Sequence, residues 1–148
     1  MNRIIQQQQE NNRNSVDHWE IAESHRQRVM TEITRGVPRG EKRLCLLGAG
    51  NCNDVDLQAL LSVFREVHVV DIDADALTMA VDRQAVADHD ALILHGGVDL
   101  CGIAEEISTW SPDPPCKPKE VKRVNKKARN FPIPELPAPF VSSCRLIC

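Results

Sequence analysis

The sequence predicts an α/β fold with a parallel sheet and helices on both of its faces. Short apolar runs and helical patterns alternate over residues 43–110 in the order strand, helix, strand, helix, strand. This alternation is typical of a parallel sheet built from βαβ units. The first run, "RLCLL", is almost entirely apolar, as expected for a strand with both faces covered. The length, 148 residues, fits one domain.

Two segments precede the first strand. Residues 1–14 are rich in Gln and Asn, so they bury too little apolar surface to order themselves, and we expect a disordered tail. Residues 15–36 place Trp19, Val29 and Ile33 on one helical face, which predicts a single N-terminal helix that ends near Gly36.

The alternating half, residues 43–110, is expected to be the ligand-binding part. Its elements are a strand at 43–47, a helix at about 54–64, a strand at 66–73, a helix from Asp73 to about 84, a strand at 91–97 and a short helix. Residues 111–139 are rich in Pro and Lys and are expected to form a loop or linker. Its basic stretch, 117–129, is either a solvated surface or a contact for an acidic substrate or RNA. Residues 140–148 have strand composition.

Composition narrows the function classes. A net charge of -3 does not favour binding to nucleic acid or to an anionic membrane. The sequence has no apolar run long enough for a transmembrane helix and no secretory signal, so the six cysteines are expected to be reduced thiols in the cytoplasm. No Cys or His spacing indicates a metal site.

The clearest functional signal is a glycine-rich turn after the first strand. Gly48 and Gly50 lie between a strand and a helix, where backbone N–H groups face the carboxyl edge of the sheet. Asp71 follows the second strand, at a separation suited to binding ribose hydroxyls. The two signals together predict a site for an adenosine ligand. The simpler alternatives are that the glycines only make a tight turn and that Asp71 is a capping or surface acid.

The turn favours a ligand without phosphate. A dinucleotide site has a third glycine where this chain has Asn53, and the acid Asp54 follows it. S-adenosylmethionine fits better, because Asp71 would bind its ribose while Asn51 and Asn53 meet its amino-acid end. The first alternative to an S-adenosylmethionine site is that the chain is a fragment of an NAD- or FAD-binding oxidoreductase.

Residues 43–99 resemble the S-adenosylmethionine-dependent methyltransferases of the Rossmann-like class. "LLGAGNCND" resembles the glycine-rich first motif, "VHVVDIDADAL" the acidic second motif and "LHGGVDL" the third. "PFVSSCRLI" resembles the family's fourth strand. The resemblance implies an incomplete three-layer sandwich, the N-terminal half of that fold. The residues that it implies for cofactor binding are Gly48, Ala49, Gly50, Asn51, Asn53, Asp71, Ile72 and Asp99.

The chain departs from this family in three places. Leu46 stands where the family often has an acid, Val141 follows Phe140 where an acid is expected, and the family's later strands do not follow. Methyl transfer depends on a nucleophile held in line with the sulfonium more than on acid–base chemistry, so the sequence indicates no catalytic residue. The methyl acceptor is unknown, because in this family the acceptor contacts come largely from later loops. A non-catalytic remnant is the second alternative. We expect weak cofactor binding without methyl transfer, and self-association through an open sheet edge.

Overall fold

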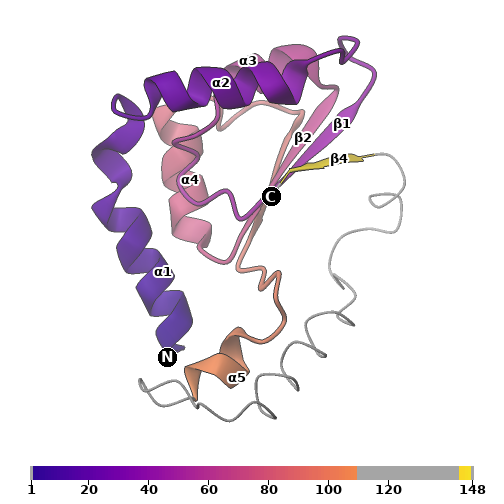
Figure 1. Ribbon diagram of the computed structural model, residues 1–148. Coiled ribbons are helices and arrows are strands. Elements are labelled where there is room, and N and C mark those ends of the chain that lie inside the picture. The colour runs from indigo at the N-terminus through magenta and orange to yellow at the C-terminus, as the bar shows by residue number, and fades with distance from the viewer. Residues whose placement is uncertain (1, 110–143, 148) are drawn as a thin grey trace.

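The fold is a parallel sheet with helices packed against it (Figure 1). The computed structural model describes residues 2–109 and 144–147. The helices are α1 (Arg3–Asn14), the 3₁₀ helix η1 (Val16–Trp19), α2 (Glu23–Thr34), α3 (Leu57–Val63), α4 (Ala74–Arg83) and α5 (Ala104–Ser108). The strands are β1 (Arg43–Leu47), β2 (Glu66–Asp71), β3 (Leu92–Gly96) and β4 (Cys144–Ile147).

The sheet has the order β3-β2-β1-β4, and every pairing is parallel. Leu44 pairs with Val67 in β2, and Val70 pairs with His95 in β3. The α/β prediction is confirmed, and β4 pairs with β1 on the side away from β2. All three carboxyl ends of β1, β2 and β3 therefore meet at one edge of the sheet, where the glycine-rich turn begins.

The core lies mainly on one face of the sheet. Leu44 and Leu46 of β1 share a buried cluster with Leu60 of α3 and Leu77 of α4. The alternate β1 residue, Cys45, belongs to a smaller cluster with Val70, Leu47, Val98 and Leu100. No residue of the helices described contributes to this second cluster, so helices on both faces remain a prediction.

The prediction of a disordered tail at residues 1–14 is wrong, because residues 3–14 form α1. The helix begins at Asn2, whose side chain accepts hydrogen bonds from the Ile4 and Ile5 amides. Its other end is held by Asn12, which is buried although the helix is polar overall. Hydrogen bonding of amide side chains thus orders a segment that has few apolar residues to bury.

The single helix predicted for residues 15–36 is also wrong, since the chain divides there into η1 and α2. The Arg26 guanidinium donates to the Trp19 carbonyl at 2.8 Å and lies 3.5 Å from the centre of the Trp19 ring. This contact joins the end of η1 to the first turn of α2. The predicted end near Gly36 is close to the observed end at Thr34, and Gly36 has a φ of 66°.

Several predictions lie outside the described residues. They include the loop at 111–139 with its basic stretch, and the parts of the C-terminal segment that flank β4. Of the helices in residues 2–109, none is long and apolar enough to cross a lipid bilayer.

Truncation of Leu60 is expected to destabilise the fold strongly. Leu60 is 0% exposed and Leu94 is 38% exposed, so the same Leu→Ala change removes a fully buried side chain from α3 and a partly exposed one from β3. We expect Leu60→Ala to lower the free energy of unfolding by about 2–5 kcal/mol and Leu94→Ala to lower it by less than half as much. Urea denaturation measures both. Equal losses would contradict the core assignment.

Candidate functional site

The glycine-rich turn follows β1 at the carboxyl edge of the sheet, and its first residues are hydrogen-bonded to the end of β2. Gly48 and Gly50 have φ values of 68° and 52°, in the region that favours glycine. The amides of Gly48 and Ala49 both donate to the Val70 carbonyl, at 2.9 and 3.2 Å. The Gly50 amide donates to Asp71 Oδ2 at 2.7 Å. All three amides, which the sequence assigns to a ligand, already have partners within the protein.

Asp71 joins the ends of the two strands. Its second oxygen, Oδ1, accepts from the Asp73 amide at 2.8 Å, and the residue is only 3% exposed. The Asp71 carbonyl accepts from Val98 at 3.1 Å, which brings the chain after β3 to the same place. The structure thus puts Asp71 beside Gly50, as predicted from the sequence, but in a buried position.

Asn51 and Asn53 hold the N-terminal segment. The Asn51 side-chain amide donates to the Asn12 carbonyl at 3.0 Å and to Ser15 Oγ at 3.2 Å. The Asn53 amide donates to the Ser15 carbonyl at 2.7 Å. The Asn12 amide in turn donates to Asp73 Oδ2 at 2.9 Å. The two asparagines that the sequence assigns to a cofactor's amino-acid end therefore bind the protein's own chain.

Two arginines complete this attachment, and the sequence analysis missed both. Arg26 donates to the Asn53 carbonyl at 3.0 Å, while Arg83 donates to the carbonyls of Val16 and Asn51 at 3.1 and 2.5 Å. Both guanidinium groups lie near the Trp19 ring. Burial lowers the pKa of Arg83 from its ordinary value, and Arg26 adds to this effect. The sequence did hold a signal for Arg26, because this charged residue lies among the apolar positions of the predicted helix and must therefore find a buried partner.

Gly50 permits a close approach by α1. A Cβ atom at Gly50 would lie 3.0 Å from Asn12 Oδ1. This distance is shorter than most contacts of Cβ atoms, so the Asn12 side chain would have to shift. The close approach that the sequence suggested for a ligand is therefore made by a side chain of the protein itself.

A cavity of about 210 Å³ opens on the other side of the turn. A Cβ atom built on Gly48 would meet no atom within 4 Å, so the backbone is open there. His25 Nε2 and Asp54 Oδ1 lie 3.6 Å apart, and both side chains are exposed. The cavity is lined by His25, Val29, Leu46, Leu47, Gly48, Ala49, Cys52, Asp54 and Val55.

The remaining predicted site residues have local roles. Asp99 accepts from the amides of Cys101 and Ala104 at 3.0 and 2.8 Å, and thereby caps α5. Ile72 is half-buried between Asp71 and Asp73. Both follow strand ends at the carboxyl edge, as predicted, but neither shows a side-chain contact with the glycine-rich turn.

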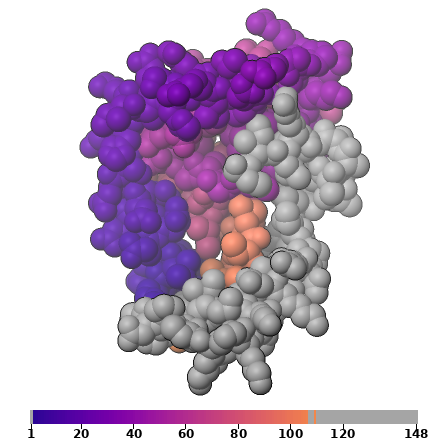
Figure 2. All heavy atoms as spheres, in the orientation of Figure 1, coloured from indigo at the N-terminus to yellow at the C-terminus, as the bar shows by residue number. Residues whose placement is uncertain are grey.

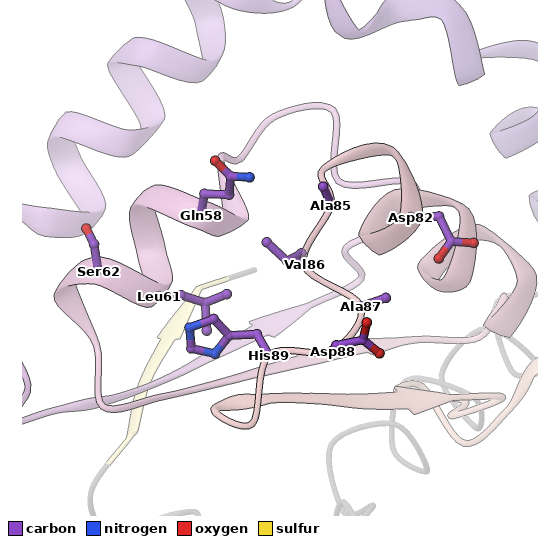
Figure 3. A pocket seen from close by; sticks show the side chains of 9 residues that line it. All are labelled: Gln58, Leu61, Ser62, Asp82, Ala85, Val86, Ala87, Asp88 and His89. Carbon is purple, nitrogen blue, oxygen red and sulfur yellow. The ribbon is translucent and has the colours of Figure 1, made fainter.

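A larger hollow of about 710 Å³ lies away from this edge (Figure 3). Gln58, Leu61 and Ser62 of α3 line one side of it, and the chain from Ala85 to His89 lines the other. This chain leads into the amino end of β3, whereas ligands of parallel sheets bind at the carboxyl end. The hollow is therefore a weaker candidate than the turn.

A histidine pair lies between β2 and β3. His68 Nδ1 and His95 Nε2 are 3.0 Å apart, and Glu66 bonds the other nitrogen of His68. This bond to His68 is the main reason why the pKa of Glu66 is lowered. Burial lowers the pKa of His95, with a smaller effect from His68. Within the described residues, no three His, Cys, Asp or Glu side chains are placed to hold a metal ion.

Comparisons of the chain with family models, curated proteins and solved structures find no match. The likeness to methyltransferases therefore depends on the motifs in the sequence.

We expect Asp71 to stabilise the fold in the absence of any ligand. Asp71→Asn replaces one acceptor oxygen by an N–H donor that faces another donor, the amide of Gly50 or of Asp73. The expected loss of unfolding free energy is about 1–3 kcal/mol in urea denaturation. Asp75→Asn makes the same change at an exposed position in the same region and is the control. A loss no greater than that of the control would contradict this role.

Cys52 is expected to be unreactive in the folded protein. Burial raises the pKa of its thiol to about 12, so roughly one thiol in ten thousand is ionised at pH 8. Iodoacetamide at pH 8 should modify the exposed Cys101 and spare Cys52 until urea unfolds the chain. Peptide mass spectrometry measures both sites. Equal rates in the folded protein would show that Cys52 is accessible.

Proposed function

We propose that the chain binds a phosphate-free adenosyl cofactor of the S-adenosylmethionine type at the carboxyl edge of β1 and β2. The observation that carries this proposal is the open backbone of Gly48 beside a cavity, in a turn joined to the strand-end acid Asp71. Backbone without side chains and a carboxylate are the groups that adenosine sites use at this edge. The methyltransferase class enters as part of the proposal, from the sequence motifs.

The cavity suits the amino-acid end of such a cofactor. Val29, Leu46 and Val55 offer apolar contact for a methylene chain. Asp54 attracts an ammonium group at the mouth, and His25 beside it can donate to a carboxylate. About 210 Å³ is less than the usual volume of a small-molecule pocket, so the cavity suits only part of the cofactor.

Asp71 suits the ribose. Each of its oxygens accepts one backbone N–H and keeps capacity for a second donor. Ribose hydroxyls supply such donors, provided that Asn12 leaves the space above Gly50.

A dinucleotide fits less well, because two of the first three amides of α3 already have partners within the protein. The Leu57 amide donates to Gln84 Oε1, and the Ala59 amide donates to Asp56 Oδ1, both at 2.8 Å. A phosphate would have to replace these partners and lie beside the Asp56 carboxylate.

The product of methyl transfer, S-adenosylhomocysteine, tests the assignment. Titration calorimetry is expected to give a dissociation constant at least ~10-fold lower for this ligand than for NAD, since only NAD brings phosphates to the acid-capped helix. Equal or reversed affinities would refute the cofactor assignment.

The position of the ligand is tested by two matched glycine substitutions. Gly48 and Gly36 have φ values of 68° and 66°, and a Cβ atom at either would meet nothing within 4 Å. Gly48→Ala and Gly36→Ala should therefore cost similar stability, about 1–2 kcal/mol. Only Gly48→Ala should weaken S-adenosylhomocysteine, by ~10-fold or more, because its methyl group enters the ligand's approach. An equal effect of both on affinity would place the ligand elsewhere.

A further inference from the structure

The last turn of α1 lies against the proposed cofactor site. Asn12 is 6% exposed, and its Oδ1 lies 3.0 Å from the position of a Cβ atom on Gly50. Its Nδ2 donates to Asp73 Oδ2 at 2.9 Å. Figure 1 shows α1 beside α4 and reaching α5.

Asn12 fills space beside the groups proposed to bind the ribose. It lies against Gly50, whose amide is bound to Asp71, and it donates a hydrogen bond to the neighbouring acid. A ribose bound to Asp71 across the Gly50 backbone would need the space that Asn12 fills. The two cannot occupy this space together.

We propose that α1 is a lid that closes the cofactor site with Asn12 in the place of the ribose, and that cofactor binding displaces it. This inference rests on the proposed function. The amino-acid end of the cofactor meets the open side of the turn at Gly48, whereas its adenosine half meets Asn12 and α1.

The attachment of α1 is suited to release. No residue of α1 belongs to the main buried cluster, and the helix is mostly Gln, Asn and Arg. Its end is held by hydrogen bonds from Asn51 and Asn53 and by the bond from Asn12 to Asp73. Opening therefore exchanges hydrogen bonds with water or with ligand and leaves the apolar core intact. Figure 2 shows α1 at the outer surface of the molecule.

A lid of this kind lowers the apparent affinity by the fraction of molecules that are open. Any change that weakens the closed state without touching the ligand's other contacts should strengthen binding. Asn12→Ala is such a change, because Asp73 keeps its bond from the Ala76 amide.

The test compares Asn12→Ala with Asn11→Ala in the full chain. Asn11 is the adjacent, exposed asparagine of the same helix, so it controls for helix propensity. We expect Asn12→Ala to bind S-adenosylhomocysteine ~10-fold more tightly by calorimetry, as follows from loss of a hydrogen bond to a charged group, and Asn11→Ala to bind like the original protein. Asn12→Ser, too short to reach Asp73, should show the same gain as Asn12→Ala. Circular dichroism checks that each variant is folded.

Hydrogen exchange of the α1 amides gives the second readout. In the original protein, saturating S-adenosylhomocysteine should accelerate exchange across residues 3–14. Equal affinity of the original protein and both Asn12 variants, or binding with unchanged α1 protection, would overturn the lid while leaving the proposed function in place. Absence of binding to the original protein and to every variant would overturn the proposed function, and the lid with it.

Discussion

The carboxylate of Asp71 is the group on which this edge of the protein depends. It accepts the Gly50 amide with one oxygen and the Asp73 amide with the other, so it holds the turn after β1 against the turn after β2. Hydrogen bonds to an ionised acceptor are stronger than those between neutral groups, and this one is shielded from water. With the turn fixed, Asn51 and Asn53 are placed to bind the N-terminal segment.

Polar groups hold the end of α1 and η1 against the turn after β1. Arg26 and Arg83 donate to backbone carbonyls on both sides of the junction and lie near Trp19. Each bond alone contributes little net stability, but a carbonyl left buried without a partner would be costly. Loss of either arginine therefore removes the donor from two carbonyls at once. This is why a segment with little apolar surface can still fold against the sheet.

Local patterns were enough to predict the strands and the helices between them. The apolar runs predicted as strands form β1, β2 and β3. Asp73 is the N-cap of α4, as predicted from its position in the sequence. The proximity of Gly50 and Asp71 followed from the rule that strand ends meet at one edge. The order in residues 3–14 could not be predicted, because it depends on contacts such as Asn12 with Asp73, which are distant in sequence. Helical periodicity also cannot detect the division into η1 and α2 after Trp19, where the Arg26 guanidinium packs on the indole ring.

The saturation of these polar groups restricts which ligands can compete for the site. A ligand that displaces Asn12 must replace its donated hydrogen bond to Asp73, or the acid loses a partner in a partly dry site. Hydroxyl groups meet this requirement, since each carries one donor. Ionised phosphates have acceptors only and would face Asp71 and Asp73 with like charge, which is unfavourable at such short range. If α1 closes the site as proposed, the contacts of Asn12 with Asp73 and of Gly50 with Asp71 favour hydroxyl groups over phosphates at this position.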